Sequence, residues 1–132
     1  MTDFAVSRTT RSWDVVGVLL STVCLIHCLA VPVGLALIPA LAGTLSEQEW
    51  LHRLVVVLAF MVVAIALVTG IRAHRRYGPL LPASVGLALL TLSLIVGEEH
   101  WAEQLVTSVG ALMTASAHLW NRALLKRALA AR

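Results

Sequence analysis

The chain has 132 residues, of which 59% are hydrophobic and 13% are charged, and its mean hydropathy is +0.88. A soluble domain of this size is closer to half apolar and a quarter charged. The composition therefore excludes a soluble enzyme, a disulfide scaffold and a disordered tail. The charges leave four long uncharged runs, at 15–46, 54–71, 77–97 and 104–121. About 20 apolar residues cross a bilayer core as a helix, so we expect one small integral membrane domain with four spans.

The first part of the chain is expected to contain a tail, one span and a short outer segment. Residues 1–12 are polar and are expected to form a cytoplasmic tail. The first span is expected over about 14–38, with a kink near 28–32 because proline cannot donate a helical hydrogen bond. A short segment on the outer side is expected at 42–50.

Three further spans and a basic tail follow. The spans are expected over about 51–73, 80–98 and 102–121. The whole transmembrane domain then covers 13–121, and 122–132 form a basic cytoplasmic tail into which the last helix is able to continue.

Lysine and arginine are distributed unequally between the two ends of such a bundle. If four helices run up and down, nine of these residues share one side: Arg8, Arg11, Arg72, Arg75, Arg76, Arg122, Lys126, Arg127 and Arg132. The other side carries only Arg53. Because cytoplasmic loops carry the excess of Lys and Arg, both termini are expected in the cytoplasm. Membrane topology thus explains the bases without nucleic acid, and the tryptophans agree, since all of them lie at run boundaries as interfacial aromatics do.

Small and weakly polar residues predict which helices meet, because lipid is as apolar as leucine and cannot drive helices together. Two stripes at helical spacing stand out: Gly17, Ser21, Cys24 and Cys28 in the first span, and Thr107, Gly110, Thr114, His118 and Asn121 in the fourth. We therefore expect an all-α, antiparallel four-helix transmembrane bundle whose first and fourth helices face each other. A weaker stripe in the third span comprises Ser84, Ala88 and Thr91.

Both cysteines of the chain lie in one short sequence, Cys24-Leu25-Ile26-His27-Cys28. Residues at i, i+3 and i+4 share a helix face, so the two thiols and the imidazole are expected to project together near the bilayer midplane. A disulfide is disfavoured, because β-carbons at this spacing are about 5–6 Å apart and a disulfide needs about 3.5–4.5 Å. Such donors suit Hg(II), Cu(I) and Zn(II), and three of them predict an open, exchanging site rather than a closed structural one.

Pro32 adds a backbone feature to this group. It is expected to leave the carbonyl of Cys28 without its helical donor, which exposes an oxygen lone pair beside the sulfurs and makes the bend a hinge. The alternative is that the cysteines are only small hydrophobic residues that pack between helices.

Further donors suggest a path across the membrane. On the outer side, Glu99 and His52 are candidate ligands near an acidic run that attracts cations, or they belong to an ordinary solvated loop. Toward the cytoplasm, His118 and Asn121 are candidates for an inner station, or they form hydrogen bonds between helices. His74 is expected to be an ordinary residue of the inner loop.

These features together resemble the MerC family of bacterial inner-membrane proteins. The resemblance covers most of the chain and rests on the pattern Ser21-x-x-Cys24-x-x-His27-Cys28-x-x-x-Pro32. Weaker matches are His52, His74-Arg75, Glu98-Glu99 and Ala117-His118-x-x-Asn121. The family is associated with uptake of mercuric ion into the cytoplasm, where a reductase detoxifies it. The resemblance implies that Cys24 and Cys28 pass the mercury.

We therefore expect a multi-pass protein of the bacterial inner membrane that transports a soft metal. Its expected ligands are Cys24, His27, Cys28, His118, Glu99 and His52. The cargo is Hg(II), with zinc and copper as alternatives, and no cofactor is expected to be bound permanently. Other readings are a zinc- or copper-binding accessory or sensor protein without conduction, and an assembly protein whose stripes only pack.

The expected partners are the metal ion, the lipid bilayer, a second copy of the chain and a cytoplasmic metal acceptor, without nucleic acid. The sequence has no catalytic triad, phosphate-binding loop or nucleotide motif, so no enzymatic activity is expected.

Overall fold

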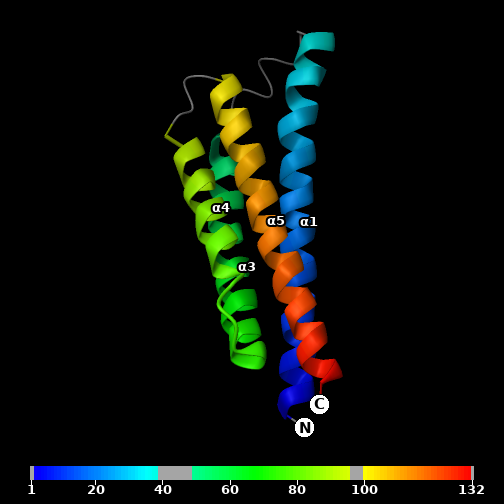
Figure 1. The fold of residues 1–132 in the computed structure, drawn as a ribbon. Helices are drawn as coiled ribbons and strands as arrows, with labels where there is room; N and C mark the ends of the chain where they lie inside the picture. Colours follow the sequence, from blue (N-terminus) through cyan, green and yellow to red (C-terminus); the bar gives the residue numbers. More distant parts are fainter. Residues whose placement is uncertain (1, 39–48, 96–99, 132) are drawn as a thin grey trace.

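The structure, a computed structural model, describes residues 2–38, 49–95 and 100–131. Four helices occupy these ranges (Figure 1): α1 over Thr2–Leu37, α3 over Glu49–His74, α4 over Leu80–Ser93 and α5 over His100–Ala130. The described ranges contain no strand, so the all-α expectation is confirmed for them.

The helix bounds differ from the expected spans at several ends. The first helix begins at Thr2 rather than near 14, so most of the expected tail is helical, and α1 continues past Pro32 to Leu37. At the other end of the chain, α5 continues through most of the expected basic tail to Ala130. The expected outer segment at 42–50 lies almost wholly outside the described residues.

The third helix, α4, is shorter than the span that the sequence predicts. It was expected to reach residue 98, but α4 ends at Ser93. The backbone tightens there, because Leu94 N–H donates to Thr91 O and Ile95 N–H to Leu92 O. Hydrogen bonds over three residues are typical of a helix terminus.

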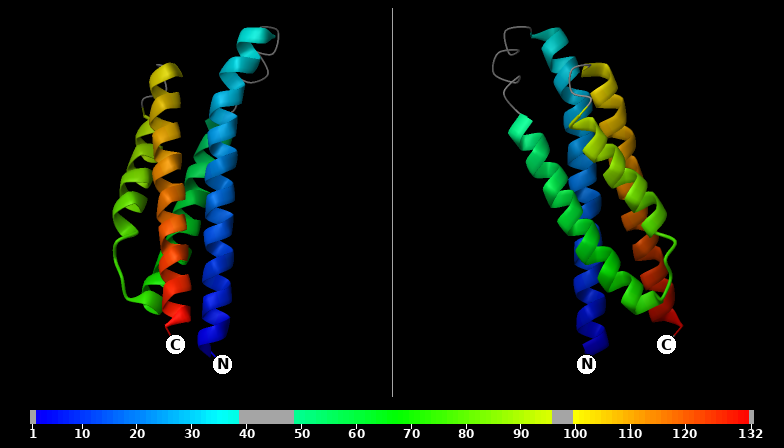
Figure 2. Two further views of the ribbon diagram at one scale, coloured as in Figure 1. Left: turned by 45° about the vertical axis from the view of Figure 1, so that its right-hand side comes forward. Right: turned by 90° about the vertical axis from the view of Figure 1, so that its left-hand side faces the viewer.

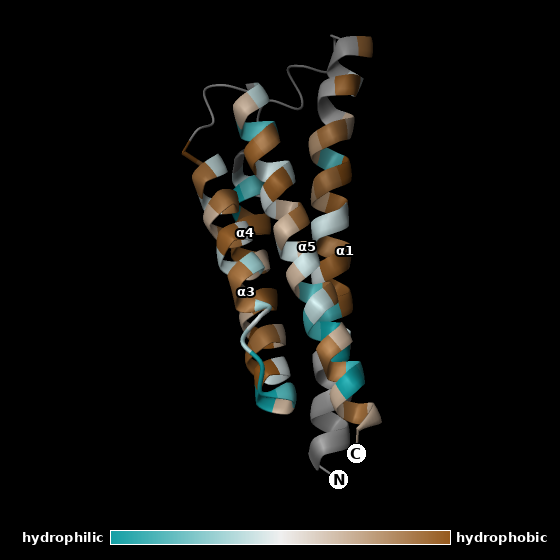
Figure 3. Ribbon diagram, viewed as in Figure 1, coloured by the Kyte–Doolittle hydropathy of each residue, from teal (hydrophilic) through white to brown (hydrophobic). Residues whose placement is uncertain are grey.

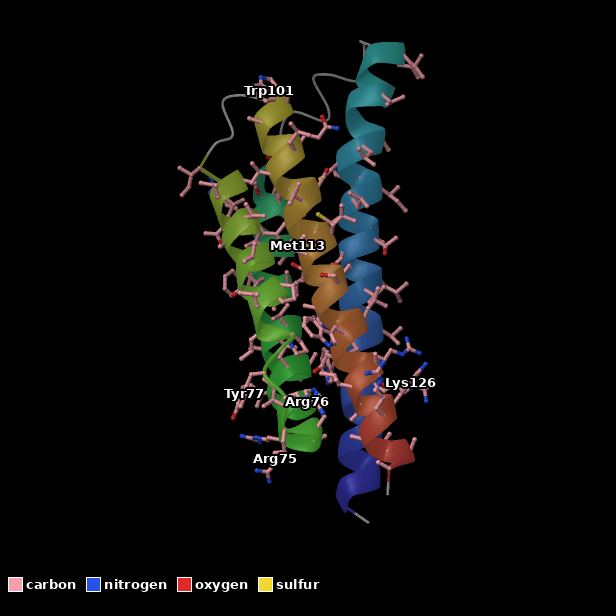
Figure 4. All side chains as sticks on the ribbon, in the orientation of Figure 1. Arg75, Arg76, Tyr77, Trp101, Met113 and Lys126 are labelled. Atoms are coloured by element: carbon pink, nitrogen blue, oxygen red, sulfur yellow. The ribbon has the colours of Figure 1, made fainter. Side chains whose placement is uncertain are left out.

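The helices run alternately up and down, and α5 contacts all three of the others (Figures 1 and 2). Both chain termini lie at the same end of the bundle as the α3–α4 connection (Figure 2). Arg75, Arg76 and Lys126 lie toward this end, and Trp101 lies at the opposite end (Figure 4). The bases are thereby separated from the outer tryptophan along the bundle axis, as the sequence predicts.

The surface of the bundle is largely apolar, as a lipid-facing surface must be. Two helical segments in the described ranges are long and apolar enough to cross a membrane, Arg11–Ala30 and His52–His74, and α4 is apolar but shorter. Large aliphatic side chains such as Leu19, Leu81 and Ile95 are exposed. Hydrophobic residues predominate along α3 and α4, and hydrophilic ones gather at the α3–α4 connection (Figure 3).

Small residues bring α4 close to α5. A β-carbon added at Gly86 would contact Thr114 and the carbonyl of Gly110, so glycine permits this approach. The predicted third-span stripe is wrong, because its three members are exposed. The buried face of α4 consists of Ala83, Gly86, Leu90 and Ser93. Part of the α5 stripe, at Gly110 and Thr114, therefore packs on α4, whereas its inner part faces α1 and α3.

Candidate metal site and the polar seam between α1 and α5

The two thiols lie together on the face of α1 that packs against α5. Cys24 and Cys28 are both free thiols and half-buried, and they are neighbours that influence each other's ionisation. One helical turn separates them, which is the spacing at which side chains of one helix meet. A cation that binds two sulfurs therefore finds both donors on one side of a single helix.

His27 does not share the burial of the thiols. Its side chain is exposed, whereas the two cysteines are half-buried toward the bundle. In the described part of the chain, no three His, Cys, Asp or Glu side chains lie close enough together to hold one metal ion. The arrangement thus provides a two-thiol site, and a ligand role for His27 stays a prediction. Glu99 lies outside the described residues.

The carbonyl of Cys28 is engaged, which corrects the expectation of a free lone pair. Gln104 of α5 donates its side-chain N–H to Cys28 O over 2.8 Å. This amide takes the place of the backbone N–H that Pro32 lacks. The hydrogen bond joins α1 to α5 at the level of the thiols, and it accounts for a helix that continues through proline.

A histidine and a carboxylate meet one residue away from this contact. His52 Nδ1 of α3 lies 3.2 Å from Glu103 Oε1 of α5, and both side chains are partly exposed. Glu103 is also an electrostatic neighbour of the Cys28 thiol. The N-terminal parts of α3 and α5 therefore place an imidazole and a carboxylate one residue away from the Gln104–Cys28 contact.

We call the line of contact between α1 and α5, from Asp14 to Cys28 on α1, the seam. A second polar cluster lies at its other end, and it is almost completely buried. It consists of Asp14, His118 and Asn121, with exposed fractions of 0%, 1% and 0%, and of His74 with 9%. Asp14 Oδ1 lies 3.1 Å from His118 Nδ1. The amide of Asn121 donates to both oxygens of Asp14, over 3.1 and 2.9 Å.

The hydrogen bonds of this cluster have a definite direction. The N–H of Arg76 donates to His74 Nδ1 over 3.1 Å, so Nδ1 accepts and the proton of a neutral ring lies on Nε2. His74 Nε2, 2.9 Å away, then donates to Asn121 Oδ1. Donors therefore converge on Asp14, and α1, α3 and α5 are joined through one carboxylate.

His74 is not the ordinary loop residue that the sequence suggested. It is the last residue of α3, and the next residue, Arg75, has a φ of 58°. A left-handed residue is a common way to end a helix. It turns the chain so that the Arg76 N–H meets the His74 ring, which is buried rather than solvated.

Two glycines make room for the cluster. A β-carbon at Gly17 would overlap the His118 ring, and one at Gly70 would overlap the Asn121 amide. Both glycines are buried. The polar side chains of α5 thus fit into notches on α1 and α3, which is the use of small residues expected between membrane helices.

The seam confirms that the first and last helices face each other. Asp14 pairs with His118, and Cys28 with Gln104. The two contacts are fourteen residues apart on each helix, or about 21 Å at 1.5 Å per residue. Asp14 and Gln104 are functional candidates that sequence reasoning missed. Asp14 continues the α1 stripe three residues before Gly17, and this spacing was the available signal.

The fold and the seam define a small helical membrane protein whose two cysteines lie one helical turn apart, between two polar clusters. A family model described as MerC mercury resistance protein matches residues 14–123. The chain therefore belongs to the MerC family, and it is a membrane protein of a mercury-resistance, transport-related family. No curated protein and no solved structure matched the chain.

Proposed function

We propose that this protein carries mercuric ion across the bacterial inner membrane into the cytoplasm through Cys24 and Cys28. The single observation that supports this most strongly is the position of the two free thiols. They lie one turn apart and half-buried in the α1–α5 seam, in a chain of a mercury-resistance family.

The chemistry of the step is ligand exchange. A divalent soft cation forms two metal–sulfur bonds as two S–H bonds break, and the two protons leave with water or with a displaced ligand. The complex is neutral, so the cation enters the apolar part of the membrane without a net charge, which would be costly there. Release requires a competing donor, which a cytoplasmic thiol acceptor supplies.

The orientation follows from the distribution of bases. Both termini and the α3–α4 connection lie at one end of the bundle (Figure 2), and the basic residues of α5 and of this connection belong to that end. Cytoplasmic segments carry the excess of Lys and Arg. This supports a four-span topology with both termini inside and the His52–Glu103 pair outside.

Accumulation of Hg(II) by cells tests the proposal. Cells that express the wild type should accumulate the ion, and Cys24→Ser and Cys28→Ser should each abolish the gain. Ser21→Ala is the matched control, because it alters the same helix face one turn away without removing a sulfur. Equal accumulation by the wild type and both cysteine variants would refute thiol-mediated uptake.

A further inference from the structure

Two histidines at opposite ends of the seam have the same relation to a carboxylate. His52 Nδ1 lies 3.2 Å from Glu103 Oε1, and His118 Nδ1 lies 3.1 Å from Asp14 Oδ1. In both rings the other nitrogen, Nε2, is buried and has no hydrogen-bond partner among the described residues. We call each carboxylate–histidine pair a dyad. The second dyad, formed by Asp14 of α1 and His118 of α5, is itself nearly inaccessible to solvent.

This arrangement fixes which nitrogen is able to bind a cation. An ionised carboxylate only accepts hydrogen bonds, so Nδ1 carries the proton and Nε2 of a neutral ring keeps its lone pair. Histidines that ligate metals almost always donate their other N–H to a carboxylate, a carbonyl or water, which holds the ring in place. A buried polar atom without a partner is costly. A cation that binds transiently to each Nε2 atom explains why both atoms lack a hydrogen-bond partner.

The outer dyad lies next in sequence to the residue of α5 that contacts the Cys28 backbone. Glu103 precedes Gln104, whose side chain is hydrogen-bonded to the Cys28 carbonyl, and its charge acts on the Cys28 thiol. Glu103 thus links the His52 ring of α3 to the segment of α5 that contacts α1 at Cys28.

The inner dyad faces the same stripe of α1, further along the seam. His118 packs against Gly17, which lies seven residues before Cys24, or about 10 Å along the helix. The backbone at Gly17 covers Nε2 in this conformation. A cation consequently reaches Nε2 when α1 moves away from α5 at that point.

We propose that these two carboxylate–histidine dyads are nitrogen ligands on either side of the thiol pair, which receive a soft divalent cation at His52 Nε2 and His118 Nε2. Glu103 and Asp14 are the positioning residues. The inference rests on the proposed function. No three donors cluster in the described ranges, so each dyad supplies a single nitrogen ligand rather than a tight site with several ligands. Passage of an ion requires sites that bind weakly enough to release it.

The test is nitrogen NMR of the purified, ¹⁵N-histidine-labelled full chain in lipid vesicles, with Hg(II) as the probe. Before metal is added, both rings should carry their proton on Nδ1. Saturating Hg(II) should shift both Nε2 resonances. Asp14→Asn should abolish the shift at His118 and leave His52 unchanged, and Glu103→Gln should do the reverse. Each variant thus contains its own control for folding.

Transport gives a second readout. Loss of a residue that orients a metal ligand costs about 10–100-fold in affinity. Each variant should therefore raise the Hg(II) concentration for half-maximal accumulation at least about ten-fold without abolishing it, unlike the cysteine variants. If the thiols bind Hg(II) and neither Nε2 resonance shifts, the dyad proposal is overturned and the thiol proposal stands. If Hg(II) leaves the thiols unligated, the proposed function itself fails.

Discussion

Replacement of Asp14 by alanine should destabilise the bundle more than any other single change in α1 outside the thiol region. The carboxylate is fully buried and accepts from His118 and Asn121. Its removal leaves the His118 N–H without an acceptor, at about 1–3 kcal/mol for a stranded buried donor. Asn121 keeps a weaker bond of 3.3 Å to Ala66 O, so its loss is smaller, about 1 kcal/mol. We expect a total of about 3 kcal/mol.

The assay is reversible unfolding of the purified protein in mixed micelles by sodium dodecyl sulfate, followed by circular dichroism. Thr22→Ala is the control on the same helix, because its hydroxyl is exposed and, among the described residues, bonds only to the Val18 carbonyl of its own helix. It should change the free energy of unfolding by less than about 0.5 kcal/mol. Polar contacts between membrane helices average about 0.6 kcal/mol in double-mutant cycles. An effect of Asp14→Ala no larger than that average would refute the reasoning that the network converges on this carboxylate.

Three further changes use the same unfolding assay. Gly17→Ala should destabilise the protein by about 1–3 kcal/mol because the new methyl group meets the His118 ring. Gly34→Ala is its control, because the added methyl group meets no described atom within 4 Å. Equal effects of the two substitutions would contradict the close packing of His118 on Gly17. Gln104→Leu should lower the free energy of unfolding by about 1 kcal/mol, since the Cys28 carbonyl loses its donor. An unchanged free energy of unfolding would mean that this hydrogen bond does not stabilise the bundle. Arg75→Gly should stabilise the protein by about 1 kcal/mol, because glycine adopts the left-handed backbone conformation of this position without the steric cost that arginine has. A destabilisation would contradict the assumption that Arg75 is strained.

The sequence predicts the helices and the main interface well because both depend on periodic patterns. Long uncharged runs locate the helices, and the spacing of Gly17, Cys24 and Cys28 on one side and of His118 and Asn121 on the other predicts the α1–α5 seam. Helix ends are predicted less well. The residues before 14 extend α1 and those after 121 extend α5. In α5 the basic residues hid an apolar face, because Leu124 and Leu125 are buried.

The sequence did not predict which side chains pair between α1 and α5. Periodicity gives the face of a helix but not its register against a neighbour, so nothing in the pattern joined Asp14 to His118 or Gln104 to Cys28. Asp14 looked like the polar boundary of an apolar run, and His74 looked like part of a basic loop. Both prove to be buried partners of Asn121, since a carboxylate among apolar helices needs donors from several of them.

The central claim is that two thiols of one helix bind the cargo. X-ray absorption at the mercury edge of the reconstituted protein, loaded with one equivalent of Hg(II), tests it most directly. The wild type should show two sulfur neighbours for each mercury atom, and Cys24→Ser and Cys28→Ser should each retain only one. A mercury atom without sulfur neighbours in the wild type would contradict the claim.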